Sequence, residues 1–320
     1  MKSSFATILL AAVAASIHAT GLETFLPKSL FTQIFPNALP IYQYDHMIAM
    51  SKMYPAFANT GNVDVDKREV AAFLGQVALE SGYLQYVEEI QKGDYCQPSN
   101  DYPCAPGQQY FGRGPIQLSW NYNYKDFGKA AQRDLVTSPG LVASDPDLVW
   151  WSAFWFWNVD KWNGNIHDVV GQPGGFAYTT YIINGGLECG TNPPNRESEK
   201  ARIANYIQYC TLLGVTPGDN LSCQTSQYPP TTPWPKTSAP PSTTKTPPAT
   251  TPVVIPTTSA PTTPMPTWTP TTAPPKTTAP PPNDKCEGNK GVCYWPLTHQ
   301  VVSYGEADCK LFPTSFVWCP

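Results

Sequence analysis

Residues 66–89, DKREVAAFLGQVALESGYLQYVEE, carry the clearest helical pattern in the chain. Asp66 and Glu69 have the spacing of a capping box, and the Ser81-Gly82 pair is a typical helix end. Between them, apolar residues recur at the i, i+3, i+4, i+7 spacing of a core-facing stripe: Val70, Phe73, Leu74 and Val77. The pattern predicts a buried helix over residues 66–81.

Glu80 occupies the next position of that apolar stripe. Partial burial and the carbonyls of a helix C-terminus both disfavour a charged carboxylate, so we expect a raised pKa and a proton donor. Glu89 follows in a more polar context and should stay ionised. Two carboxylates in such different environments are typical of a glycosidase acid and base. The same residues also fit a solvated helix end followed by a surface pair, Glu88 and Glu89.

Composition excludes several classes of partner. Charged residues make up 14% of the chain, the net charge is −4, and no basic patch is present, which argues against nucleic acid and anionic membranes. The histidines lack ligand spacing, so we expect no metal and no cofactor: His18, His46, His167 and His299. We expect a monomer. The nine cysteines of a chain with an export signal predict disulfides and one unpaired thiol.

The chain divides by composition into four parts. Residues 1–19 have the positive start, short apolar core and small final residue of a signal peptide, which predicts a secreted, extracellular protein. Residues 20–223 are long enough for one sizeable core. Residues 224–283 are rich in Pro and Thr and predict a disordered, extended spacer. Residues 284–320 predict a small disulfide-rich module.

The last module has four cysteines that allow three pairings: Cys286, Cys293, Cys309 and Cys319. Its aromatic residues are too many for so small a core to hide: Tyr294, Trp295, Tyr304, Phe316 and Trp318. Exposed rings on a stapled scaffold suit stacking on a polysaccharide. A small folding cap or a protein-binding module is the alternative.

Residues 20–223 are predicted to be mainly α-helical. Besides residues 66–81, helices are expected over residues 44–57, 145–157 and 197–213. Asp145 is the expected N-cap of the third, with Pro146 in its first turn. Because this helix is apolar on nearly every side, we expect its tryptophans to pack in the core rather than bind sugar.

Residues 92–124 are expected to form a loop rich in amides, hydroxyls and rings. Uncharged groups of these kinds suit a neutral sugar, because amides and hydroxyls bond its polar groups and rings stack on its faces. The densest run begins after Pro115: Gln117, Ser119, Trp120, Asn121, Tyr122, Asn123 and Tyr124. A purely structural role fits this composition as well.

Five segments together resemble the family 19 chitinases of plants and bacteria. They are PAFANTG at 55–61, AAFLGQVALESG at 71–82, FGRGPIQLSWNYNY at 111–124, IINGGLECG at 182–190, and the expected helix with Arg202 and Ile203 that is followed by Leu-Gly-Val at 213–215; they occur in the family's order. The resemblance covers about residues 22–223. It implies a mainly α, two-lobed, lysozyme-like domain with a cleft, and a secreted endochitinase acting on polymers of β-1,4-linked N-acetylglucosamine.

The resemblance also implies roles for single residues. Glu80 matches the general acid and Glu89 the general base of an inverting reaction, with Glu88 as the base if the register slips by one. Ser119 matches the residue that helps hold the attacking water. The remaining matches are sugar-binding positions and an ion-pair network around the acid: Gln117, Tyr122, Asn123, Asn184, Arg202 and Glu188.

Disulfides Cys96–Cys104 and Cys189–Cys223 are implied in the same way. They leave Cys210 over, on the apolar side of its helix, where we expect a buried, inert thiol. His167 and the neighbouring Asp168 could line the cleft, but a structural role is favoured.

One departure from the family concerns the residue before the acid. The family usually has a histidine there, and this chain has Leu79. A chitin-binding protein with impaired catalysis is therefore one alternative function. A peptidoglycan hydrolase is another, because lysozyme-like clefts also take cell-wall glycans. The chain also lacks the long insert that plant members carry between the two carboxylates, which predicts a shorter cleft.

Overall fold

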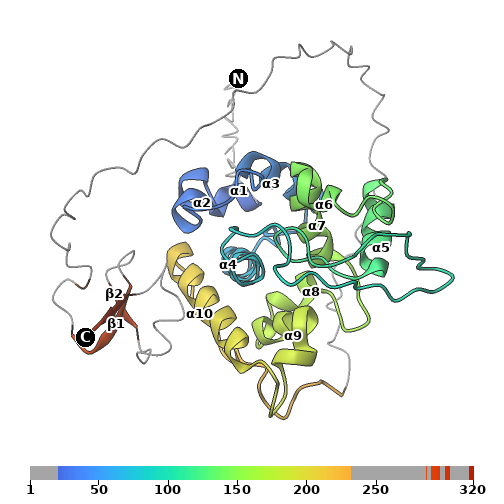
Figure 1. The fold of residues 1–320 in the computed structure, drawn as a ribbon. Helices are drawn as coiled ribbons and strands as arrows, with labels where there is room; N and C mark the ends of the chain where they lie inside the picture. The colour runs from blue at the N-terminus through green and yellow to red at the C-terminus, as the bar shows by residue number, and fades with distance from the viewer. Residues whose placement is uncertain (1–20, 232–285, 287–289, 296–299, 303–316) are drawn as a thin grey trace, which may run out of the picture. The chain divides into compact units, whose positions relative to one another are not determined.

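The computed structural model describes residues 21–231, 286, 290–295, 300–302 and 317–320 (Figure 1). The expected signal peptide and most of the expected spacer lie outside these residues. The chain divides into two compact units, residues 1–244 and 245–320. The described part of the first unit is built from helices, as predicted: α1 (Leu22–Phe25), α2 (Lys28–Ile34), α3 (Tyr44–Ser51), α4 (Val63–Glu80), α5 (Asn121–Ala131), α6 (Leu141–Ser144), α7 (Pro146–Asn158), α8 (Ile166–Val170), α9 (Gly175–Glu188) and α10 (Arg196–Leu213).

Helix α4 lies near the middle of this unit and packs along α10 (Figure 1). The predicted stripe is confirmed, because all four of its side chains are fully buried. Gly75 allows the two helices to approach closely: a Cβ there would lie 3.2 Å from the backbone nitrogen of Tyr206 on α10. Helix α4 ends at Glu80, with Ser81 as its C-cap.

The predicted N-terminus of α4 is wrong. The helix begins at Val63, and its N-cap is Asn62, whose side chain accepts hydrogen bonds from two backbone amides. The Asp66 carboxylate instead accepts bonds from Thr60. Glu69 is buried and accepts bonds from the Ala58 amide and the Trp157 indole. The supposed capping box therefore secures the preceding loop, because tertiary partners replaced the local ones.

Helix α7 confirms its predicted start and its place in the core. Asp145 caps it by accepting bonds from two backbone amides. Trp150 and Trp157 are fully buried, and Phe154 stacks on Phe73 of α4 with ring centroids 4.7 Å apart. A second hydrophobic cluster forms beside this core around α5 and includes Phe127.

Other elements differ from expectation. Helix α3 ends at Ser51, six residues before the predicted end, whereas α10 (Arg196–Leu213) confirms its prediction to within one residue and has Asn195 as its cap. Residues 121–131, which were expected to start as loop, form α5. The N-cap of α5 is Trp120, which has a φ of 77° and makes no side-chain capping bond. The sequence therefore contains no ordinary cap residue from which the start of α5 could be predicted.

The described cysteines of the first unit form two disulfides, Cys96–Cys104 and Cys189–Cys223. Cys210 is buried, and burial raises the pKa of its thiol to about 12, which keeps it protonated. Packed structure continues past Cys223, since the Tyr228 ring lies 5.6 Å from that of Tyr181.

The described residues of the second unit form an antiparallel sheet. Strands β1 (Val292–Trp295), β2 (Gln300–Val302) and β3 (Val317–Cys319) pair in the order β2-β1-β3. A disulfide joins Cys286 to Cys319. Tyr304, Cys309 and Phe316 lie outside the described residues. In the part of the chain that the structure describes, no helix is long and apolar enough to cross a membrane.

His167 gives the fold a testable pH dependence. Burial alone would lower the pKa of His167, but the Glu69 carboxylate 2.6 Å from Nδ1 outweighs burial and raises it. A raised folded-state pKa stabilises the fold below the unfolded value of about 6.5, and this stability disappears as pH rises through the folded value. His167→Gln should therefore lower the free energy of unfolding more at about pH 5.5 than at about pH 8.5.

Denaturant titrations at the two pH values measure this difference. His46→Gln is the control, because His46 pairs with Asp147 at a more exposed site. A loss of stability in His167→Gln that does not change with pH would contradict the argument.

Candidate active site

A cleft of about 1620 Å³ contains both predicted catalytic carboxylates. Glu80 enters it from the end of α4, and Glu89 from the loop that follows. The positions of the loop and of α9 that the resemblance matched to sugar or water contacts line the same cleft: Gln117, Ser119, Tyr122, Asn123 and Asn184. Arg202 and Glu188 are buried and do not line it. The His167 side chain does not line it either, and its bond to Glu69 gives it a structural role.

Glu80 is largely shielded from water, with 17% of its side chain exposed. Its Oε1 accepts a hydrogen bond of 2.5 Å from Nη2 of Arg202. Burial raises the pKa of Glu80, and this effect outweighs the guanidinium, which acts in the opposite direction. The carboxyl group is therefore biased toward its protonated form.

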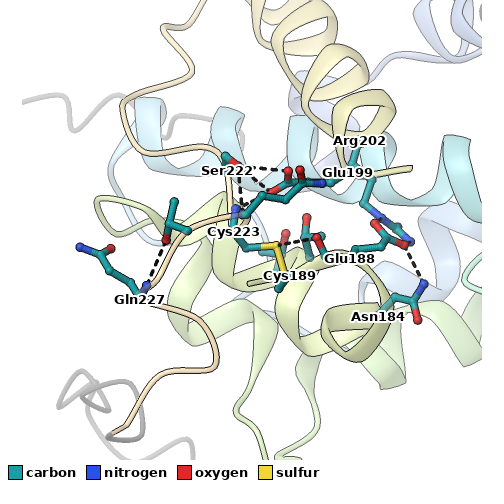
Figure 2. Close-up of a disulfide and its surroundings, with 12 residues drawn as sticks. Asn184, Glu188, Cys189, Glu199, Arg202, Ser222, Cys223 and Gln227 are labelled. Atoms are coloured by element: carbon teal, nitrogen blue, oxygen red, sulfur yellow. Dashed lines mark hydrogen bonds and ion pairs between the residues drawn. A yellow bond between two sulfur atoms is a disulfide. The ribbon is translucent and has the colours of Figure 1, made fainter. Parts of the chain in front are cut away.

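Arg202 is shared between two carboxylates, and the charge of the second one, Glu188, adds to the effect of burial on the pKa of Glu80. The Nε and Nη2 of Arg202 donate to the two oxygens of Glu188 at 2.8 Å each, and both residues are drawn in Figure 2. Nη1 donates to Gln76 at 2.7 Å. Arg202 and Glu188 are almost fully buried, at 2% and 1% exposure. One cation cannot neutralise two carboxylates, so an ionised Glu80 would leave one buried negative charge unbalanced.

Asn184 connects this network to the cleft. It breaks helix α9 with a φ of −148° and ψ of 33°, and its Nδ2 donates to Glu188 at 2.7 Å (Figure 2). The same side chain lines the cleft. Asn184 therefore connects the cleft surface to the carboxylate that pairs with Arg202.

Glu89 has a contrasting environment. Its Oε1 accepts a bond of 2.6 Å from the Tyr95 hydroxyl, and its Oε2 accepts one of 3.0 Å from the Gly112 amide. The bond to Glu89 raises the pKa of Tyr95 to about 12, so the phenol remains a donor. Two donors facing the carboxylate suit an anion.

Glu88, the alternative base, points elsewhere. Its carboxylate pairs with Lys92 at 2.6 Å and with Arg113 at 3.4 Å, and it does not line the cleft. The geometry therefore favours Glu89 as the base.

Gly112 brings the loop residues close to Glu89. A Cβ at Gly112 would lie 2.8 Å from Oε1 of Gln117 and 3.3 Å from Oγ of Ser119, so a larger residue would displace both. The Ser119 hydroxyl donates to the Gln117 carbonyl at 2.9 Å, and Asn123 donates to the Ser119 carbonyl at 2.8 Å. These bonds fix polar groups beside the Glu89–Gly112 contact.

A row of aromatic side chains runs along the cleft from Glu89. Tyr95 meets Trp120 edge-on at 5.2 Å, Trp120 stacks on Tyr122 at 6.1 Å, and Tyr122 meets Tyr102 at 6.3 Å. Tyr95 and Tyr102 were not singled out by the sequence. The available signal was their position beside Cys96 and Cys104, whose disulfide folds the loop onto the cleft.

Asn121, expected in the sugar-binding run, is fully buried instead. Its side chain bonds the backbone of Gln97 and Tyr102 and so holds that loop in place. In the part of the chain that the structure describes, no group of three or more His, Cys, Asp or Glu residues is placed to hold a metal ion.

The charge balance around Arg202 can be tested by Glu188→Gln. This change keeps the shape of residue 188 but removes the negative charge that contributes to the raised pKa of Glu80. Arg202 then balances Glu80 alone, so the pKa of Glu80 should fall. An NMR titration of ¹³C-labelled glutamate carboxyls measures it, with Glu197→Gln, an exposed residue of α10, as control. A pKa of Glu80 that stays unchanged or rises in Glu188→Gln would refute the balance.

Comparison with known proteins places the first unit in a family. The family model described as "Chitinase class I" matches residues 33–223. Endochitinase 1 of Theobroma cacao is 41% identical over 239 residues, which cover 63% of this chain and 74% of that protein. An endochitinase of Carica papaya is 38% identical, over 63% of this chain and 97% of its own length.

Solved structures agree with this assignment. Chitinase C of Streptomyces griseus HUT6037 has 41% identity and a TM-score of 0.58, covering 62% of this chain and 97% of that chain. The class IV chitinase of Zea mays has 38% identity and a TM-score of 0.55, covering 62% and 98%. The match extends over most of the chain and includes the segments that build the cleft, so this protein belongs to the glycoside hydrolase family 19 chitinases.

Proposed function

We propose that this protein is an endo-acting chitinase that hydrolyses β-1,4-linked N-acetylglucosamine polymers with inversion at the anomeric carbon. The observation that carries the proposal is the pair of carboxylates in one cleft with opposite environments. Glu80 is shielded, and its pKa is raised. Glu89, the second carboxylate, accepts hydrogen bonds from the Tyr95 hydroxyl and the Gly112 amide. The resemblance to endochitinases supports the choice of substrate.

Glu80 begins the reaction as the proton donor to the leaving glycosidic oxygen. When it loses its proton it becomes a carboxylate that already contacts Arg202, so the new charge is stabilised without rearrangement. Glu89 takes a proton from a water on the opposite face of the sugar, and Ser119 helps to orient that water. An inverting reaction of this kind requires the carboxyl groups to lie roughly 6.5–9.5 Å apart.

Glu80→Gln and Glu89→Gln should each lower kcat on a soluble N-acetylglucosamine hexamer by about 10²–10⁴-fold, because each removes one proton transfer. The measurement is product formation by mass, with NMR of the first anomer released by the wild type. Glu88→Gln, beside the base but outside the cleft, is the matched control and should retain most activity. A predominantly β first product, or full turnover by Glu80→Gln, would contradict the mechanism.

Leu79 does not prevent the acid from assembling. Arg202, which bonds Glu80, lies on α10, and Glu188, the other carboxylate that Arg202 bonds, lies on α9. The network therefore forms with leucine at position 79. A binding protein without activity is therefore the weaker alternative. A peptidoglycan hydrolase remains a distinct outcome, which clearing of bacterial walls without turnover of chitin would reveal.

Leu79→His should change kcat/KM on the hexamer by less than about tenfold, which corresponds to about 1.4 kcal/mol of transition-state stabilisation. Steady-state kinetics of the two proteins in parallel measure it. An increase of a hundredfold or more would mean that the leucine leaves the native site impaired, and would favour the binding alternative.

We further propose that the protein is secreted and that its C-terminal module binds polysaccharide. Disulfides in both units support an oxidising compartment. The proposed spacer would keep the module attached to the hydrolase and so raise the effective concentration of the cleft at an insoluble substrate.

A further inference from the structure

We propose that Trp162 forms an outer sugar subsite at the rim of the cleft, where its indole stacks on one unit of a long N-acetylglucosamine chain. This inference rests on the proposed function and extends it. Trp162 lines the cleft, and 89% of its surface is exposed, more than for any other large hydrophobic side chain in the described residues. Single exposed apolar residues are common, so exposure alone decides nothing. The decisive feature is how the chain presents this indole.

Trp162 lies at the tip of a tight turn. The amides and carbonyls of Lys161 and Gly164 exchange two hydrogen bonds of 3.0 Å each, which leaves Trp162 and Asn163 as the two residues between them. Gly164 has a φ of 128°, and a Cβ there would lie 3.2 Å from the Tyr178 ring and 3.3 Å from Ile182. The turn is therefore seated closely on α9.

Side chains on both sides of Trp162 fix the turn to two helices. Asn163 donates to the Ile182 carbonyl of α9 at 3.2 Å. The Lys161 side-chain nitrogen donates to the Phe156 carbonyl and, at 3.0 Å, to the Val159 carbonyl, both at the C-terminus of α7. Burial lowers the pKa of Lys161 to about 7. The same nitrogen lies 4.2 Å from the centre of the Phe156 ring.

The turn is thus held while the indole is left free. A rigid aromatic surface binds a sugar face with little loss of conformational entropy, because its position is set before the ligand arrives. Within the described residues, Trp162 stacks on no other ring. The exposed indole therefore does not contribute to holding the turn in place. A ligand in the cleft would supply the missing partner.

The position of Trp162 indicates which sugars it contacts. The aromatic row that begins at Tyr95, beside the base, belongs to the loop and to α5. Trp162 is outside that row and follows α7. It lines the cleft from an exposed turn and has no contact with either carboxylate. We therefore assign Trp162 to a sugar distant from the cleaved bond, which a long chain reaches and a short oligomer does not.

Kinetics on two chain lengths test this assignment in the full-length protein. Trp162→Ala should lower kcat/KM for the hexamer about tenfold through KM, equivalent to about 1.4 kcal/mol, and leave the tetramer within twofold. Trp162→Phe should retain most of the hexamer activity, because a ring remains. Ile207→Ala, at an exposed position of α10 outside the cleft, should match the wild type on both substrates.

Oxidation of tryptophan by N-bromosuccinimide, read by peptide mass, gives a measurement independent of turnover. In full-length Glu80→Gln, bound hexamer should slow the oxidation of Trp162, and tetramer should not. Unprotected Trp162 with hexamer bound, or identical hexamer kinetics for Trp162→Ala and the wild type, would overturn the subsite. If the wild type did not hydrolyse either oligomer, the proposed function would be rejected. Protection of Trp162 by bound hexamer would support the subsite even in that case.

Discussion

The shared ion pair of Arg202 with Glu80 and Glu188 is the interaction on which the active site depends. It joins three helices, because Glu80 ends α4, Glu188 ends α9 and Arg202 lies on α10. A buried cation is tolerated only when its partners are in place, and removal of one partner from such a pair typically costs about 3–5 kcal/mol. The close approach of α4 and α10 at Gly75 is what brings these groups together.

The same network separates the roles of the two carboxylates. Glu80 competes with Glu188 for one cation in a shielded site, whereas Glu89 is met by a phenol and a backbone amide. The two environments are built from different parts of the fold, helix ends around Glu80 and a glycine-containing loop around Glu89. The two carboxylates therefore have different electrostatic surroundings although both line one cleft.

Local patterns in the sequence predicted what is determined locally. The stripe of α4, its end at Glu80 and the cap of α7 at Asp145 depend on residues close in sequence, and all three are confirmed. The cap of α4 was misassigned because Glu69 bonds Trp157, which lies 88 positions away. Helix α5 was missed because its entry through Trp120 uses an uncommon backbone conformation. Tyr95 and Tyr102 line the cleft because of the way the loop folds, and this fold could not be predicted from the residues near them in sequence.

The disulfide between Cys189 and Cys223 restrains the end of α9, where Glu188 lies. Cys189 directly follows Glu188, and the amide of Cys223 is held by Glu199 of α10 (Figure 2). The end of α9 is thus tied covalently to a segment anchored on the helix that carries Arg202. Reduction of the disulfide would remove this covalent link, and the position of Glu188 would then rest on its hydrogen bonds with Arg202 and Asn184. The bridge therefore restrains the carboxylate that shares Arg202 with Glu80.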